Sequence, residues 1–155
     1  DNFKSNKLKW ITYLSATSVY GNHNGEWVDE NSETKPTSPN GVERKKNNHV
    51  CTSIHVQDMA NILWSALNNL KKKEIYNISD NLPASAEEVA MYGVKLLGLD
   101  KPKTIEINEI ESEMLKNFYK DSKKVDNKKM KQFFNHKLKY PTYVEGLNYI
   151  FNKTI

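Results

Sequence analysis

The segment 13–21, which reads YLSATSVYG, places several hydroxyl side chains directly before a glycine. In an open α/β sheet, ligands bind beyond the carboxyl ends of the strands, so Thr17, Ser18 and Tyr20 are candidate substrate-binding residues. Hydroxyl side chains at a strand end also bond to backbone groups where the chain turns, without contacting any ligand. We favour this second role for Thr17 and Ser18, and the substrate-binding role stays open.

His55 is one of four histidines and directly precedes a segment with helical spacing of apolar residues. Imidazole titrates near neutral pH, which makes His55 a candidate general base or substrate-binding residue. The alternative role is that of a hydrogen-bonded scaffold residue at the entry to the helix. Asp58, three residues further on, is expected to place negative charge in the first helical turn, where the helix dipole favours it.

The elements that would position these residues alternate between strands and helices. Apolar residues recur at helical spacing over 56–70, and Ser85 with Glu88 forms the capping-box pattern of a second helix that should end at Gly98. Further helices are expected over 108–119, 127–134 and 142–153, short strands over 8–15, 74–80 and 103–107, and a long polar loop over 21–41. This alternation predicts an α/β fold with parallel strand pairing.

Composition excludes several classes of protein. The net charge is +4, but Arg44 is the only arginine, and arginine is the residue enriched in phosphate and base contacts, so we expect no nucleic-acid partner. Cys51 is the only cysteine and belongs to no cluster with metal-ligand spacing, so we predict no metal and a reducing compartment. The sequence contains no apolar run of about 18 residues and no signal-peptide core, which predicts no membrane association and a cytoplasmic location.

Seven motifs follow one another in an order that resembles a known family. They are YLSATSVYG, WVDE, PTSPNG, IHVQDMANIL, IYNISDNLPAS, SKKVDN and YPTYVEGL. Together they resemble the later part of an atypical extended short-chain dehydrogenase/reductase of the NAD(P)-dependent epimerase/dehydratase family. The resemblance implies a partial Rossmann-type domain over 1–80, with a parallel sheet and flanking helices, and a small C-terminal α/β substrate domain over 81–155. It also implies NAD or NADP as cofactor and a small molecule, such as a nucleotide sugar, as substrate.

Two family features are missing from this sequence. One is the glycine-rich turn whose backbone N–H groups hold the dinucleotide pyrophosphate. The other is a segment made of a helix, a strand and a loop, which the family has between the positions of residues 44 and 45. We therefore expect a gap between these two residues. Either the protein is shortened, or these segments are missing from this sequence.

The resemblance also locates the family's catalytic positions. Redox members use a Ser or Thr hydroxyl, a Tyr as acid and base, and a Lys four residues later that lowers the pKa of the Tyr phenol. By resemblance these positions are Ala16, Asn40 and Arg44. The Asn40 amide forms hydrogen bonds but exchanges no proton near neutral pH, whereas Arg44 keeps a charge that could hold a ribose or phosphate. The resemblance therefore implies cofactor-binding roles for Asn40 and Arg44, without the usual proton transfer.

Two further positions bear on the substrate. Ser18 lies two residues beyond Ala16 and would share its strand face if the strand continued. The Ser18 hydroxyl is therefore the candidate to replace the family's Ser or Thr hydroxyl, which Ala16 lacks. The family often has an arginine just before the IHV motif, able to bind a substrate phosphate, but this position is Ser53. We therefore expect an incomplete or atypical oxidoreductase of the nucleotide-sugar epimerase/dehydratase type. The alternative is a non-catalytic relative that binds a small molecule or a protein partner.

Overall fold

The computed structural model describes residues 10–36, 49–69, 73–103, 105 and 109–154. In chain order the elements are the 3-10 helix η1 (Thr17–Tyr20), β1 (Trp27–Val28), α1 (Val56–Asn68), α2 (Ala86–Leu97), α3 (Glu113–Lys120), β2 (Lys124–Val125), α4 (Lys128–Phe134) and α5 (Tyr143–Thr154). Asn40, Arg44 and the junction between residues 44 and 45 lie outside the described residues.

The molecule is an α/β structure with one small parallel sheet. β1 pairs with β2, with Trp27 opposite Lys124 and Val28 opposite Val125. The prediction of an α/β fold with parallel pairing is confirmed at this level, while a full Rossmann sheet is not formed within the described residues. A single antiparallel bridge between Cys51 and Ala84 joins two further segments.

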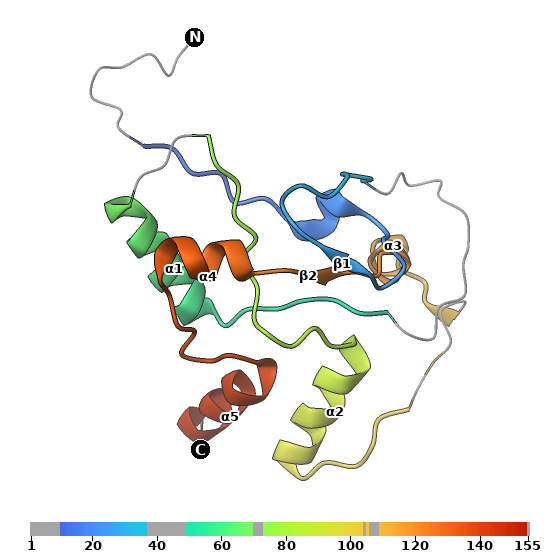
Figure 1. Ribbon diagram of the computed structural model, residues 1–155. Helices are drawn as coiled ribbons and strands as arrows, with labels where there is room; N and C mark the ends of the chain where they lie inside the picture. The colour runs from blue at the N-terminus through green and yellow to red at the C-terminus, as the bar shows by residue number, and fades with distance from the viewer. Residues whose placement is uncertain (1–9, 37–48, 70–72, 104, 106–108, 155) are drawn as a thin grey trace.

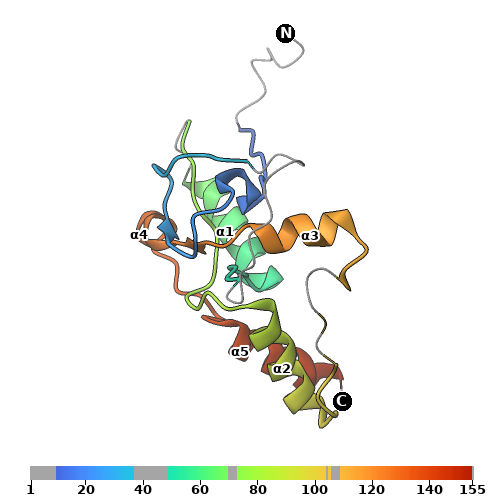
Figure 2. The ribbon, with the colours of Figure 1, turned by 90° about the vertical axis from the view of Figure 1, so that its right-hand side faces the viewer.

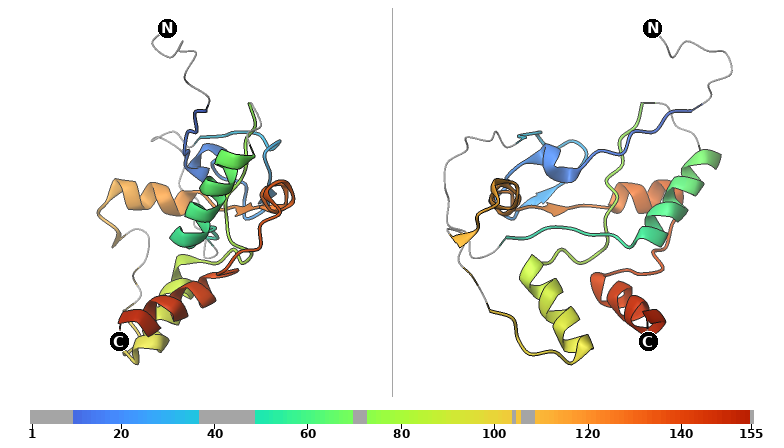
Figure 3. Two further views of the ribbon diagram at one scale, coloured as in Figure 1. Left: turned by 90° about the vertical axis from the view of Figure 1, so that its left-hand side faces the viewer. Right: turned by 180° about the vertical axis from the view of Figure 1, so that it is seen from behind.

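Four of the helices form two pairs. α1 packs beside α4, and α2 packs beside α5, below the first pair in the view of Figure 1. α3 projects away from these pairs, as the view from the side shows (Figure 2). Seen from behind, the chain leading into α1 runs alongside the segment that contains β2 (Figure 3). Among the described residues, no helix combines the length and the apolar character needed to cross a bilayer.

The buried interior is small and unusually polar. One apolar cluster joins Tyr20, Val28 and Val125 around the sheet, and a second joins Ile62, Met130 and Leu138 between α1 and α4. Among the described residues, eight apolar and eight polar or charged residues are buried. Because a buried polar group is costly unless it is hydrogen-bonded, the contacts between segments must include many specific hydrogen bonds.

Two of the predicted helices begin at the residues that the sequence predicts. α1 lies within the predicted range 56–70. α2 begins with a complete capping box, in which the Ser85 hydroxyl accepts from the Glu88 N–H and the Glu88 carboxylate accepts from the Ser85 N–H. It ends at Gly98, whose φ of 63° lies in the left-handed region that glycine adopts without a steric cost.

The capping box supports a first prediction. Ser85→Ala should lower the free energy of unfolding by about 1 kcal/mol, because the Glu88 N–H then loses its partner. Urea denaturation followed by circular dichroism measures the change. Ser85→Thr keeps the hydroxyl and should remain close to the wild type. An alanine variant as stable as the wild type would contradict this role of Ser85.

The predicted strand at 8–15 is wrong for its described part. Residues 10–16 form no strand, and Ile11, Tyr13 and Leu14 are 63%, 87% and 58% exposed. The apolar run is typical of a buried strand, but a strand also needs a hydrogen-bonded neighbour, and the described residues supply none here. The chain instead turns into η1, so Ser18 shares no strand face with Ala16.

The other predicted strands also differ from the structure. Residues 74–80 form no ladder, and neither do the described residues of 103–107, while β1 lies inside the predicted long loop. β1 and β2 have two residues each. Such short strands are defined by pairing with a distant segment and leave no periodic pattern in the sequence.

Candidate functional site

Ser122 joins the loop before β1 to the chain that leads into α1. Its carbonyl oxygen accepts hydrogen bonds from the backbone N–H groups of His23 at 3.1 Å and Gly25 at 2.9 Å. Its hydroxyl accepts from the Val50 N–H at 3.1 Å, and its own N–H donates to Asn22 Oδ1 at 3.3 Å. Three segments far apart in the sequence therefore meet at one buried residue.

Cys51, Ser53, Asp80 and Lys123 form what we call the polar cluster. The Ser53 hydroxyl donates to Asp80 Oδ2 at 2.8 Å, and the Asp80 N–H donates to the Ser53 carbonyl at 2.6 Å. Burial raises the pKa values of the Asp80 carboxyl and the Cys51 thiol and lowers the pKa of the Lys123 ammonium. Burial thus shifts all three groups toward their neutral forms, a behaviour found in functional sites and in structural networks.

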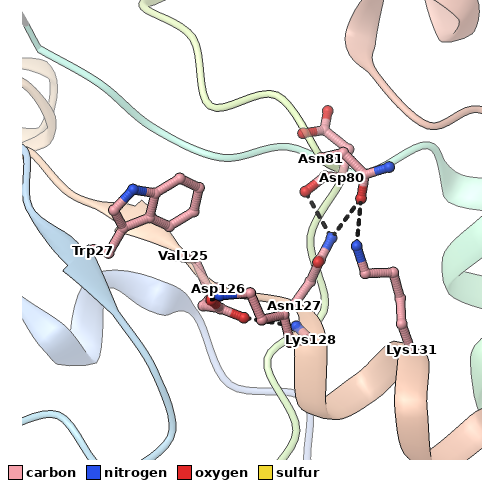
Figure 4. Close-up of a pocket in the computed structure, with 8 residues that line it drawn as sticks. All are labelled: Trp27, Asp80, Asn81, Val125, Asp126, Asn127, Lys128 and Lys131. Carbon is pink, nitrogen blue, oxygen red and sulfur yellow. Dashed lines mark hydrogen bonds and ion pairs between the residues drawn. The ribbon is translucent and has the colours of Figure 1, made fainter.

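A pocket of about 480 Å³ lies beside the polar cluster and shares Asp80 with it (Figure 4). Its lining residues are Trp27, Asp80, Asn81, Val125, Asp126, Asn127, Lys128 and Lys131. They come from β1, from the segment before α2, and from the end of β2 and the start of α4. The parallel pairing of β1 with β2 brings the first and last of these segments together.

Asn127 holds the wall of this pocket in place. Its Nδ2 amide group donates to the carbonyl oxygens of Ser79 and Asp80, both at 2.8 Å, and to Asn81 Oδ1 at 3.0 Å. Lys131 Nζ also donates to Asn81 Oδ1, at 3.1 Å. The segment 79–81 is therefore fixed to the start of α4, and the positions of the polar wall groups follow from this contact.

An indole ring lies on the opposite side of the pocket. Trp27 is 55% exposed, although it belongs to a strand, and Figure 4 shows it across the pocket from Asn81 and Lys131. Lys128 Nζ pairs with Asp126 Oδ2 at 2.9 Å. The pocket thus combines a flat apolar surface with amide, carboxylate and ammonium groups, an arrangement that can bind a small polar ring.

Tyr20 lies behind the pocket rather than in its lining. Its hydroxyl donates to Asn77 Oδ1 at 2.8 Å, and its ring packs with Val125, which also lines the pocket. Burial raises the pKa of the Tyr20 phenol. In η1, Thr17 is half-buried and Ser18 is exposed, and Ala16 at its N-terminus provides no side-chain cap. None of these residues lines the pocket.

His55 lies in a different part of the structure. Its Nδ1 atom accepts from the Gln57 N–H at 3.2 Å, which caps α1. Its ring packs against Tyr140 and Tyr149, with centroid distances of 4.0 and 5.7 Å. The structure therefore does not bring His55 together with Thr17 and Ser18 at the pocket.

Sequence reasoning did not identify Trp27, Asp80 or Asn127 as site residues. A signal was present, because two of the Asp-Asn pairs in the sequence, Asp80–Asn81 and Asp126–Asn127, lie within the described residues. Both pairs line the pocket. Within the residues that the structure describes, no three His, Cys, Asp or Glu side chains gather in a way that could hold a metal ion.

Comparisons with known proteins were made at the levels of family, sequence and structure. No protein-family model matches the sequence, and no curated protein matches it either. A solved structure of a functionally unknown conserved protein from Silicibacter pomeroyi DSS matches with a TM-score of 0.83 and 27% sequence identity. The match covers 91% of this chain and 65% of that structure, so the chain spans less than two thirds of its relative.

Proposed function

We propose that this chain is part of an NAD(P)-dependent oxidoreductase of the epimerase/dehydratase type, and that the pocket binds its small-molecule substrate. The order of the seven sequence motifs supports the family. The observation that carries the binding proposal is the exposed Trp27 indole across the pocket from a wall of hydrogen-bonding groups.

The chemistry of the pocket favours a sugar ring, such as that of a nucleotide sugar. The apolar face of a sugar ring can pack on an indole, while its hydroxyls exchange hydrogen bonds with carboxylates and amides. Asp126 and Asn81 offer such groups in the lining, and Lys128 and Lys131 offer ammonium groups suited to an attached phosphate. The position of Asn81 is fixed by its hydrogen bond from Asn127.

The described residues do not by themselves fit a dinucleotide cofactor. Gly21 and Gly25 lead toward β1, and Gly98 ends α2, so none of these three opens a helix whose N-terminus could hold a pyrophosphate. Asn40 and Arg44, the cofactor-binding candidates, lie outside the described residues. NAD or NADP is therefore proposed from the family resemblance alone, and no reaction step is derived through it.

The second candidate function is that of a non-catalytic relative which binds the same class of ligand. The observation in its favour is Ala16, an exposed methyl side chain at the position where the resemblance implies a catalytic hydroxyl. The two functions differ in turnover. An oxidoreductase of this type should convert a sugar nucleotide into a product that chromatography separates from the substrate, whereas a binding protein should bind the sugar nucleotide and leave it unchanged.

Calorimetric titration with UDP-glucose, NAD(H) and NADP(H) tests the proposal. Trp27→Ala should weaken UDP-glucose binding about fivefold, because an aromatic contact contributes about 1 kcal/mol. Trp64→Ala is the matched control, since Trp64 is 70% exposed on α1 and lies outside the pocket lining. Equal affinities for the two variants, or no sugar-nucleotide binding by the wild type, would overturn the substrate pocket.

A further inference from the structure

Two tyrosines, a histidine and two lysines gather where the start of α1 meets α5. His55, Tyr140, Tyr149, Lys139 and Lys153 form this group, which we call the tyrosine–lysine cluster. The rings of Tyr140 and Tyr149 lie 4.8 Å apart, and His55 packs against both. The cluster joins the start of α1 to α5 and to the chain just before α5.

Both lysines converge on the Tyr149 ring. Lys139 Nζ lies 5.6 Å and Lys153 Nζ 4.8 Å from its centroid, and Lys139 Nζ is also 5.4 Å from the centroid of Tyr140. Among the described residues, neither ammonium group is paired with a carboxylate. The Lys153 ammonium group beside the Tyr149 phenol lowers the pKa of that phenol.

The cluster has more hydrogen-bond donors than acceptors. Gln57 Oε1 accepts from the Tyr140 hydroxyl at 3.2 Å and from Lys139 Nζ at 3.5 Å. An ammonium group has three N–H donors and no acceptor, so most of the donor capacity of the two lysines is left for a ligand or for water. A ligand that satisfies it must be rich in acceptor oxygens and carry negative charge.

Two carboxylates lie near the cluster, and both are already engaged. Asp58 is fully buried and accepts from the backbone N–H groups of Lys139 and Tyr140, both at 2.8 Å. Glu145 on α5 accepts from the backbone N–H and the hydroxyl of Thr142. Neither carboxylate pairs with Lys139 or Lys153, so neither takes the place of an external anion.

We propose that the tyrosine–lysine cluster is an anion site that binds a phosphate group between Lys139, Lys153 and the Tyr149 hydroxyl. A phosphate presents three or more acceptor oxygens and up to two negative charges, which matches the surplus of donors. The site shares no residue with the pocket, so it does not depend on the function proposed for that pocket.

The test is calorimetric titration of the whole chain with inorganic phosphate and with phenyl phosphate at low ionic strength. Lys153→Gln and Lys139→Gln should each weaken binding about tenfold, and Tyr149→Phe should weaken it less because it removes one hydrogen bond and no charge. Lys35→Gln is the matched control, because it removes the same charge from an exposed lysine that pairs with Glu33. Circular dichroism checks that each variant is folded.

The two ligands distinguish a phosphate ester from free phosphate. Tighter binding of phenyl phosphate than of inorganic phosphate would identify the ligand as a phosphate ester, and equal binding would identify it as free phosphate. Both results support the site if the Lys35 variant binds like the wild type. An equal loss in all three lysine variants would mean attraction to net charge alone and would overturn the proposal. The absence of phosphate binding at about 10 mM would overturn it as well.

Discussion

Asp58→Ala is expected to lower the free energy of unfolding by about 3 to 5 kcal/mol, one of the largest effects of any single substitution in this chain. The Asp58 carboxylate is fully buried and accepts from the backbone N–H groups of Lys139 and Tyr140, both at 2.8 Å. His136 Nε2 lies 3.6 Å from Asp58 Oδ1. Alanine would leave the two backbone donors without an acceptor in the interior.

The same contact connects α1 to the chain that enters α5, so its loss should also affect tertiary structure. Asp58→Asn keeps one acceptor oxygen and nearly the same volume, so we expect about half the loss seen with alanine. Glu87→Ala, an exposed position on α2, is the control and should change stability by less than about 0.5 kcal/mol.

Urea denaturation followed by far-UV circular dichroism measures all three variants. If Asp58→Ala unfolded at the same urea concentration as Glu87→Ala, the carboxylate would not be the link between α1 and α5 that the hydrogen bonds describe. A loss from Asp58→Asn as large as that from Asp58→Ala would show that the charge, and not the number of acceptors, is what matters.

Asn127→Asp is expected to lower the free energy of unfolding by about 2 to 4 kcal/mol, more than Asn127→Ala. The Asn127 amide nitrogen donates to the carbonyl oxygens of Ser79 and Asp80 and to Asn81 Oδ1. A carboxylate has the same shape but no N–H, so at neutral pH its oxygen would face three other oxygens. The variant should also lose sugar-nucleotide binding, because these contacts hold the pocket wall.

The pH dependence of this variant provides an internal control. Facing acceptor oxygens raises the pKa of a carboxyl at position 127 in the folded protein above its unfolded value. The folded state then binds the extra proton more tightly than the unfolded state does. The loss of unfolding free energy caused by Asn127→Asp should therefore shrink as the pH falls toward about 4, where the protonated acid can again donate a hydrogen bond. A penalty that is constant from pH 7 to pH 4, measured relative to the wild type at each pH, would contradict this account of Asn127.

Helices were the part of the fold that local sequence could predict. The apolar spacing after Val56, the capping box at Ser85 and the glycine at position 98 each depend on residues within one or two turns, and the structure confirms all three. The strands were predicted at the wrong places. The apolar run at 10–16 has no partner among the described residues, whereas Trp27 and Val28 pair with β2 from within a polar loop.

In the candidate site, too, local sequence was not enough to predict which residues come together. Residues chosen for their chemical type, such as Thr17, Ser18 and His55, lie in η1 or at the cap of α1 and do not meet. Those that line the pocket were not recognised as site residues, because the hydrogen bonds of Asn127 join positions 46 to 48 residues apart. The roles of Asn40 and Arg44 remain predictions from the resemblance.

The sequence by itself determined the helical segments, the α/β class and the absence of a cysteine pair, since these follow from composition and from contacts between near neighbours. Only the tertiary structure decided which polar residues are buried, where the parallel sheet forms, and that two Asp-Asn pairs face one pocket. These features depend on contacts between distant segments, and their energies arise only once folding removes water from the groups that meet.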